Sequence, residues 1–146
     1  MSQTNSSTWV YDIQDKIASR ISAICTAKLK VKYPSKYGDL TVTTNSHELA
    51  TAKFPCVYIQ FLAPLEIGKD LVGQDVNAIY LTVQISVIVP TAKKMETARE
   101  VTSVVTDAMK EMAFGATLAE FADTDSEYRT ISRFTRTIGC GESLYH

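Results

Sequence analysis

Two long segments repeat apolar residues every three or four positions, the spacing that is typical of amphipathic helices. The first, predicted at about residues 8–31, carries a stripe of Val10, Ile13, Ile17, Ile21 and Ile24. The second, predicted at about residues 92–113, buries Met95, Ala98, Val101, Val105, Ala108 and Met112. Hydroxyl side chains before each segment can cap it, Tyr33-Pro34 stops the first, and we expect Gly115 to close the second.

Four other segments predict strands. Residues 77–89 are the clearest strand. Tyr80–Val87 alternates strictly, and the segment places five residues on the core face, namely Leu81, Val83, Ile85, Val87 and Val89. Residues 126–139 are rich in Tyr, Thr, Ile and Phe, residue types that strands favour. Residues 40–44 and 54–62 are shorter candidates, and Pro55 is compatible with a strand start or an edge. The fold class predicted is α+β, a single-domain α/β sandwich whose mostly antiparallel sheet is flanked by two main helices, in the order α-β-β-β-α-β.

The connection between the second and third strands, residues 63–76, is too long for a tight hairpin turn. Connections longer than about 12 residues in compact domains tend to be functional or disordered. Its large aliphatic residues, among them Leu65, Ile67, Leu71 and Val72, argue against simple disorder, and two glycines allow it to bend. We therefore predict a long hairpin loop that acts as a contact arm, through Leu65, Ile67, Lys69, Asp70, Leu71, Val72 and Asp75. A fold-back of the aliphatics onto the core is the alternative.

The last predicted strand carries three arginines, Arg129 and Arg133 on one face and Arg136 on the other. Arginine binds carboxylates and phosphates through two parallel bonds and is enriched at protein interfaces. We predict that at least one of the three pairs with a carboxylate of its own or a neighbouring protomer. The candidates are Glu66, Asp70, Asp75 and the acids of residues 120–127. The competing interpretation is a solvated edge strand whose charges discourage aggregation.

Composition narrows the classes of function. The 146 residues fit one domain, residues 1–146, in which we expect residues 1–7 to be a flexible N-terminus, and no apolar run approaches a membrane span. The net charge of −1 provides no global basic field for nucleic-acid binding. Residues 1–53 hold seven Lys/Arg against four Asp/Glu, whereas residues 54–146 hold eight against twelve. Such a protomer can complement a copy of itself.

Residues with catalytic or metal-binding chemistry do not form a recognisable set. His47 stands beside Ser46 and Glu48, but adjacent loop residues rarely reach triad geometry. Three widely spaced cysteines form no CxxC pair, which favours buried free thiols in a reducing cytosol. The spacing of a calcium loop fails after Asp123, because the twelfth position is Phe134. We expect no enzyme activity, no cofactor and no metal.

The chain resembles the tail terminator proteins of long-tailed bacteriophages and related phage tail-like particles, over residues 9–144. The resemblance rests on the order of elements more than on motifs. Its characteristic parts are the opening Tyr11-Asp-Ile-Gln-Asp-Lys-Ile-Ala18, the strand–Pro–helix junction at residues 85–95, and the ending Tyr128-Arg-Thr-Ile-Ser-Arg-Phe…Gly139. Pro55 and the polar residues 45–53 depart from the pattern and leave the first strand pair unassigned.

The resemblance implies a structural virion protein, made in the host cytoplasm, at the head-proximal end of the tail. Such proteins form a homohexameric ring that caps the tail tube, ends its polymerisation and offers its other face to the neck and head-closure proteins. Genomic DNA would pass through without sequence-specific binding, and no membrane is involved. Two alternatives remain open. One is a head-closure or neck component, and the other is a small intracellular enzyme or ligand-binding module that holds an anion through Cys140 and the arginines.

Overall fold

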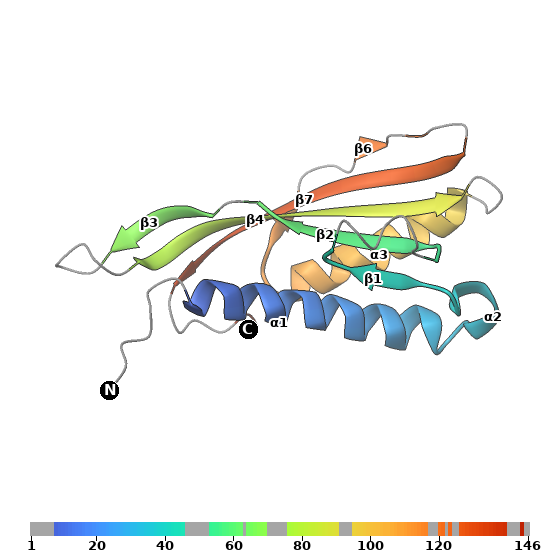
Figure 1. Cartoon of the computed structure of the whole chain (residues 1–146), viewed down its shortest axis with the longest axis horizontal. Helices are drawn as coiled ribbons and strands as arrows, with labels where there is room; N and C mark the ends of the chain where they lie inside the picture. The colour runs from blue at the N-terminus through green and yellow to red at the C-terminus, as the bar shows by residue number, and fades with distance from the viewer. Residues whose placement is uncertain are drawn as a thin grey trace.

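The computed structural model describes residues 8–45, 53–62, 64–69, 76–90, 95–116, 120–121, 123, 126–139 and 144. Within these residues the chain forms three α-helices, one π-helix and a seven-stranded sheet (Figure 1). None of the described helices is both long and apolar enough to cross a membrane. The predicted class, an α+β sandwich with a mostly antiparallel sheet flanked by helices, is confirmed.

The first predicted helix is present in two parts. Helix α1 spans Thr8–Cys25, and a π-helical turn, η1, continues it over Thr26–Lys30. The amide of Val31 donates to the carbonyl oxygen of Thr26 at 2.8 Å, and the chain then turns. Pro34 follows as the first residue of a short helix, α2, over Pro34–Tyr37, a position where its missing N–H costs nothing. The prediction that the long helix ends before Pro34 is confirmed.

Helix α3 spans Met95–Glu111 and ends at a residue that the sequence did not mark. Ala113 has a positive φ of 60°, and the amides of Ala113 and Phe114 donate to the carbonyl oxygens of Lys110 and Met109. These bonds form a Schellman motif, in which glycine usually occupies the left-handed position. The prediction that Gly115 closes this helix is therefore wrong. Gly115 lies one step further on, in the two-residue strand β5, Gly115–Ala116.

The sheet has the strand order β1-β2-β4-β7-β5. Its two central strands are long: β4 spans Val76–Pro90 and β7 spans Glu127–Gly139. They pair antiparallel from Ala78 opposite Gly139 to Pro90 opposite Glu127. Strand β2, Cys56–Phe61, pairs antiparallel with the second half of β4. Strand β1, Thr41–Thr43, runs parallel to β2. All four predicted strands therefore exist.

The expected hairpin loop is largely a strand. Strand β3, Leu65–Lys69, pairs antiparallel with the first half of β4, from Leu65 opposite Tyr80 to Lys69 opposite Val76. The pairing shifts register on both sides of Gly68, as at a β-bulge. The prediction of a loop across residues 63–76 is wrong for residues 65–69. Figure 1 shows the resulting hairpin reaching past the N-terminal end of α1.

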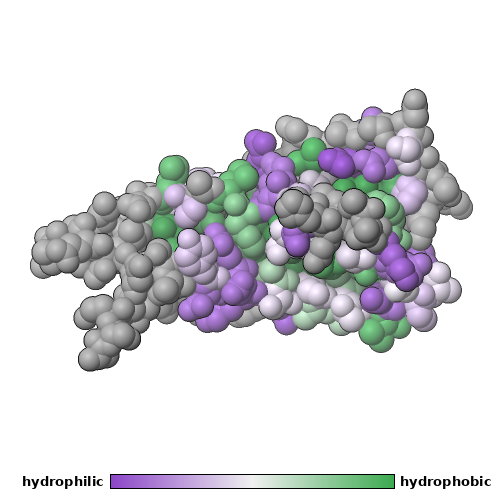
Figure 2. All heavy atoms as spheres, in the orientation of Figure 1, coloured by the Kyte–Doolittle hydropathy of each residue, from purple (hydrophilic) through white to green (hydrophobic). Residues whose placement is uncertain are grey.

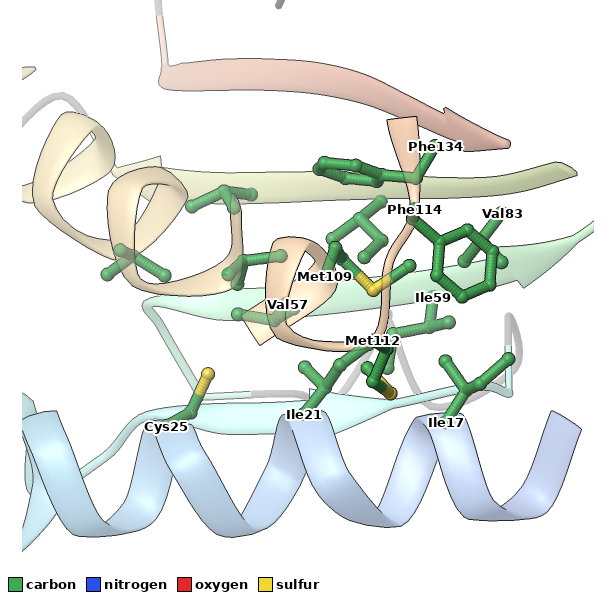
Figure 3. Packing of buried hydrophobic residues seen from close by; sticks show 14 of the residues in the cluster. Ile17, Ile21, Cys25, Val57, Ile59, Val83, Met109, Met112, Phe114 and Phe134 are labelled. Atoms are coloured by element: carbon green, nitrogen blue, oxygen red, sulfur yellow. The ribbon is translucent and has the colours of Figure 1, made fainter. Parts of the chain in front are cut away.

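Both long helices cover the same face of the sheet. Ile17 and Ile21 of α1, Met109 of α3 and Phe134 of β7 belong to one buried cluster and are each at most 1% exposed. Figure 3 shows the two isoleucines pointing from α1 toward the sheet, with Met112 and Phe114 filling the space below Phe134. The predicted core face of residues 81–89 is buried in this cluster, which confirms its alternation. The molecule is thus a two-layer sandwich, and the sheet's second face points away from the helices.

Candidate interaction surface

The outer face of the sheet, which points away from the helices, changes from buried to exposed along the strands. At one end Cys56 and Ile88, which are paired across β2 and β4, are 0% and 3% exposed. Toward the hairpin, Tyr80 of β4 is 38% exposed and Leu65 of β3 is 63% exposed. The half of the outer face nearest the hairpin is therefore the half that is available for contact.

Three side chains form a hydrogen-bonded row across the middle of this face. The Nε2 of Gln84 in β4 donates to the Oε1 of Gln60 in β2 at 3.0 Å. The Nε of Arg133 in β7 donates to the Oε1 of Gln84 at 2.9 Å. The three residues are register partners on adjacent strands, so the rigid sheet sets their spacing. This row holds the exposed Arg133 guanidinium in a defined place before any partner arrives.

Exposed apolar side chains lie beside the row, where the hairpin leaves the sheet. Leu65 and Tyr80 are direct cross-strand partners. Leu62, which is 37% exposed, follows β2, and its amide donates to the carbonyl oxygen of Thr82 at 3.1 Å. Figure 2 shows hydrophobic surface where the hairpin begins and a hydrophilic area over the N-terminal part of α1. We call Leu62, Leu65, Tyr80 and Arg133 the outer patch.

Arg129 lies on the same outer face as Arg133 and has a carboxylate partner in its own chain. Its Nη2 lies 3.1 Å from the Oε1 of Glu127, and its amide donates to the Oδ1 of Asp123. The prediction that one of the three arginines pairs with a carboxylate among the acids of residues 120–127 is confirmed. The Arg129 pair is partly exposed, so its contribution to stability is about 0–1 kcal/mol.

Arg136 lies on the inner face, as the alternation predicted, and is only 7% exposed. Its Nη1 donates to the carbonyl oxygens of Met112 at 2.7 Å and Leu144 at 3.1 Å. The guanidinium therefore joins β7 to the end of α3 and to the C-terminal segment. We predicted a surface contact for Arg136, and the structure shows an internal role for it instead.

The interpretation of the arginine strand as a solvated edge does not hold. Strand β7 pairs with β4 on one side, and on the other with β5 at Phe134 and Thr135 and with β6, Glu120–Phe121, at Thr130 and Ile131. At these four residues β7 therefore has a partner strand on both sides. The position of β7 in the sheet therefore does not support the interpretation that its arginines protect an exposed sheet edge.

Two of the remaining predicted contact residues, Ile67 and Lys69, are part of strand β3, where the pairing with β4 shifts register on both sides of Gly68. Asp70, Leu71, Val72 and Asp75 lie outside the described residues, as do residues 1–7, His47 and Cys140. Sequence reasoning missed Tyr80 and Leu62. Tyr80 did carry a signal, since a large aromatic residue stood on the polar side of an alternating strand.

An ion pair links α2 to α3. The Nζ of Lys36 lies 3.0 Å from the Oε2 of Glu100, and this contact holds the pKa of Glu100 below its usual value. Tyr37 lies beside them with no exposed surface, and burial, together with the Glu100 carboxylate, raises the pKa of its hydroxyl. Burial also raises the pKa of the Cys25 thiol to about 12, so that thiol stays neutral and unreactive.

Two adjacent hollows lie between α1 and the strands β1 and β2, with volumes of about 560 and 460 Å³. Both are lined in part by Ala18, Thr44 and Ile59. The ionisable side chains in their linings are Asp15 and Tyr58. Among the described residues, no group of three His, Cys, Asp or Glu side chains is placed to hold a metal ion.

Comparison with known proteins does not assign a function to this surface. No model of a protein family matches the sequence, and no curated protein matches it.

Proposed function

We propose that this chain is a tail terminator of a long-tailed bacteriophage or a related tail-like particle. In this role six copies form a ring that caps the tail tube, ends its polymerisation and presents a surface for head joining. The observation that carries the proposal is the β3–β4 hairpin, which projects beyond helix α1 and exposes Leu65 and Tyr80. The resemblance in the order of elements supports it.

The hairpin suits a contact with a tube for two physical reasons. The backbone of β3 is paired with β4, so the surface of the hairpin is formed before a partner binds. Binding therefore costs less conformational entropy than it would if a free loop had to become ordered. Its exposed cross-strand pair, Leu65 and Tyr80, offers apolar area, and aromatic residues are frequent anchors of interfaces. The proposed ring therefore reaches the last ring of tube subunits through six copies of this hairpin.

The same proposal defines the other partners and the location. The opposite side of the ring meets the neck or head-closure protein, and genomic DNA passes through the ring. The net charge of −1 suits passage without tight, sequence-independent binding. The protein would be made in the host cytoplasm and end at the head-proximal end of the tail.

Polymerisation of the tube protein encoded by the same genome tests the proposal. Tubes would be grown in vitro with and without the purified chain and imaged by electron microscopy. We expect shorter tubes that carry a six-fold ring at one end. Leu65→Ser should reduce capping, whereas Val31→Ser, at an equally exposed apolar residue far from the hairpin, should not. Tubes that elongate unchanged and bear no ring would contradict the proposal.

A further inference from the structure

Helix α1 carries a solvent-facing surface that complements the outer patch in charge and in apolar character. Tyr11, Asp12 and Asp15 are exposed near the N-terminal end of the helix, and Tyr11 is 63% exposed. They lie opposite the helix stripe of Ile13, Ile17 and related residues that packs on the sheet. We call Tyr11, Asp12 and Asp15 the helix patch.

The two patches lie on opposite sides of the two-layer sandwich. The outer patch is on the sheet face that points away from the helices, and the helix patch is on the solvent-exposed side of α1, where Asp15 also borders the hollow beside Tyr58 of β2. Figure 1 shows α1 along one side of the molecule, with β4 and β7 beyond it, and the N-terminal end of α1 on the side of the β3–β4 hairpin. One copy can therefore present its helix patch to the outer patch of the next.

We propose that the outer patch of one copy binds the helix patch of the next copy. Arg133 would face the carboxylates of Asp12 and Asp15, and Tyr11 would pack against the exposed Leu62, which leaves Leu65 and Tyr80 of the same patch for the proposed contact with the tube. The inference rests on the proposed ring and names the contact that builds it. Because the two surfaces differ, the contact is head-to-tail, and head-to-tail contacts generate rings when the rotation closes.

The chemistry of the two patches favours a second copy as the occupant. Both patches combine an exposed aromatic residue with charge, of opposite sign in the two cases. Arg133 is already held by Gln84, so little side-chain entropy is lost when it meets a carboxylate. Like charges oppose the binding of a patch to its own copy. A closed two-fold dimer would need both patches of one copy to meet the same neighbour, which their placement on opposite sides of the molecule disfavours.

Charge reversal on each side tests the contact. Arg133→Glu and Asp12→Lys/Asp15→Lys should each weaken self-association by about 30-fold or more, as expected on losing one partner of an interface pair. A mixture of the two variants should assemble again, because every contact in an alternating ring then joins opposite charges. Sedimentation velocity measures assembly, and thermal unfolding confirms that each variant is folded. Leu62→Asp places a charge on an apolar residue of the outer patch and is a second disruption of the contact.

Matched charge reversals on α3 serve as controls. Asp107→Lys and Lys110→Glu change exposed residues of another helix face and should leave assembly within about twofold of the wild type, since surface substitutions away from a contact have small effects.

Each result separates the contact from the proposed function. Normal assembly of both patch variants would overturn the contact and leave the ring standing. Loss of assembly without recovery in the mixture would also overturn it, because Arg133 would then face a different partner. Normal self-assembly of Arg133→Glu with loss of tube capping would assign the outer patch to the tube instead. A wild-type chain that stays monomeric alone and on tubes would overturn both the ring and its contact.

Discussion

The guanidinium of Arg136 donates a hydrogen bond to the carbonyl oxygen of Met112 at 2.7 Å, and so ties the last strand to the end of helix α3. A helix ends with carbonyl groups that lack partners within the helix, and a cation there also complements the negative end of its dipole. A second bond from the same Nη1 holds the carbonyl oxygen of Leu144. One buried side chain therefore connects three parts of the chain.

Arg136→Ala should destabilise the fold. The substitution leaves two carbonyl groups without their charged donor, and hydrogen bonds of this kind contribute about 1.5–3 kcal/mol each, so we expect a loss of about 2–3 kcal/mol. Urea unfolding followed by circular dichroism measures it. Arg133→Ala on the same strand is the control and should cost less than about 1 kcal/mol, because its side chain is exposed. Equal losses for the two variants would refute the internal role of Arg136.

Ala113→Gly should stabilise the protein. Ala113 has a φ of 60°, a left-handed conformation that costs an L-residue about 1–2 kcal/mol and glycine almost nothing. After the larger entropy of an unfolded glycine is subtracted, we expect a gain of about 0.5–1 kcal/mol. The control is Ala116→Gly in strand β5, where glycine should cost about 0.5–1 kcal/mol. Thermal unfolding that shows both substitutions moving stability in the same direction would contradict this explanation of the helix end.

Stability should depend on pH through Glu100. Its folded-state pKa lies below the ordinary value of 4.5 because Lys36 binds the carboxylate. The stabilisation is therefore present above the pKa of the unfolded chain and is lost as pH falls through the lower folded-state pKa. The pair is exposed, so Glu100→Gln should cost less than about 1 kcal/mol at pH 7 and nothing at low pH.

Urea unfolding of the wild type and of Glu100→Gln across this pH range measures the effect. Asp39→Asn is the control, because its partner Lys53 lies 3.8 Å away and both side chains are more exposed. A difference between wild type and Glu100→Gln that grows as pH falls would have the wrong sign for this ion pair.

Replacing residues 66–74 with a short Gly/Ser linker should abolish tube capping and leave the domain folded. The first half of β4 keeps its partner in β7, since Ile79 and Ile138 are register partners and both are buried. We therefore expect a melting temperature within a few degrees of the wild type, because a loss of 1 kcal/mol shifts a domain of this size by about 2–4 °C. Failure to fold would show instead that the hairpin belongs to the core.

The sequence revealed the elements whose apolar residues recur over many positions. Strand β4 and helix α3 each bury five or more residues on one face. The sequence pattern was therefore sufficient to predict the type of each element and the face that it buries. Met109 was missed, although it has no exposed surface, because the buried stripe of α3 is wider than the spacing suggested. The two-residue strands β5 and β6 depend on the free side of β7 and have no periodicity of their own.

The misread parts of the site have local causes. Strand β3 contains Gly68, where the register shifts, and a glycine with a bulge hides the alternation that marks a strand. The end of α3 was placed at Gly115 because glycine usually occupies a left-handed helix end, whereas the chain uses Ala113. Alternation separated Arg136 from Arg133 correctly. It could not show that the carbonyl groups of Met112 and Leu144 meet Arg136, because that contact depends on tertiary packing.

The length of tails made without this chain tests the central proposal most directly. The gene would be inactivated in the genome that encodes it, and the particles would be measured by electron microscopy, with a plasmid copy of the wild-type gene as the control. A terminator that stops tube growth predicts overlong tubes of irregular length without heads, and normal particles after complementation. Tails of normal length that are joined to heads in the absence of the protein would contradict the account.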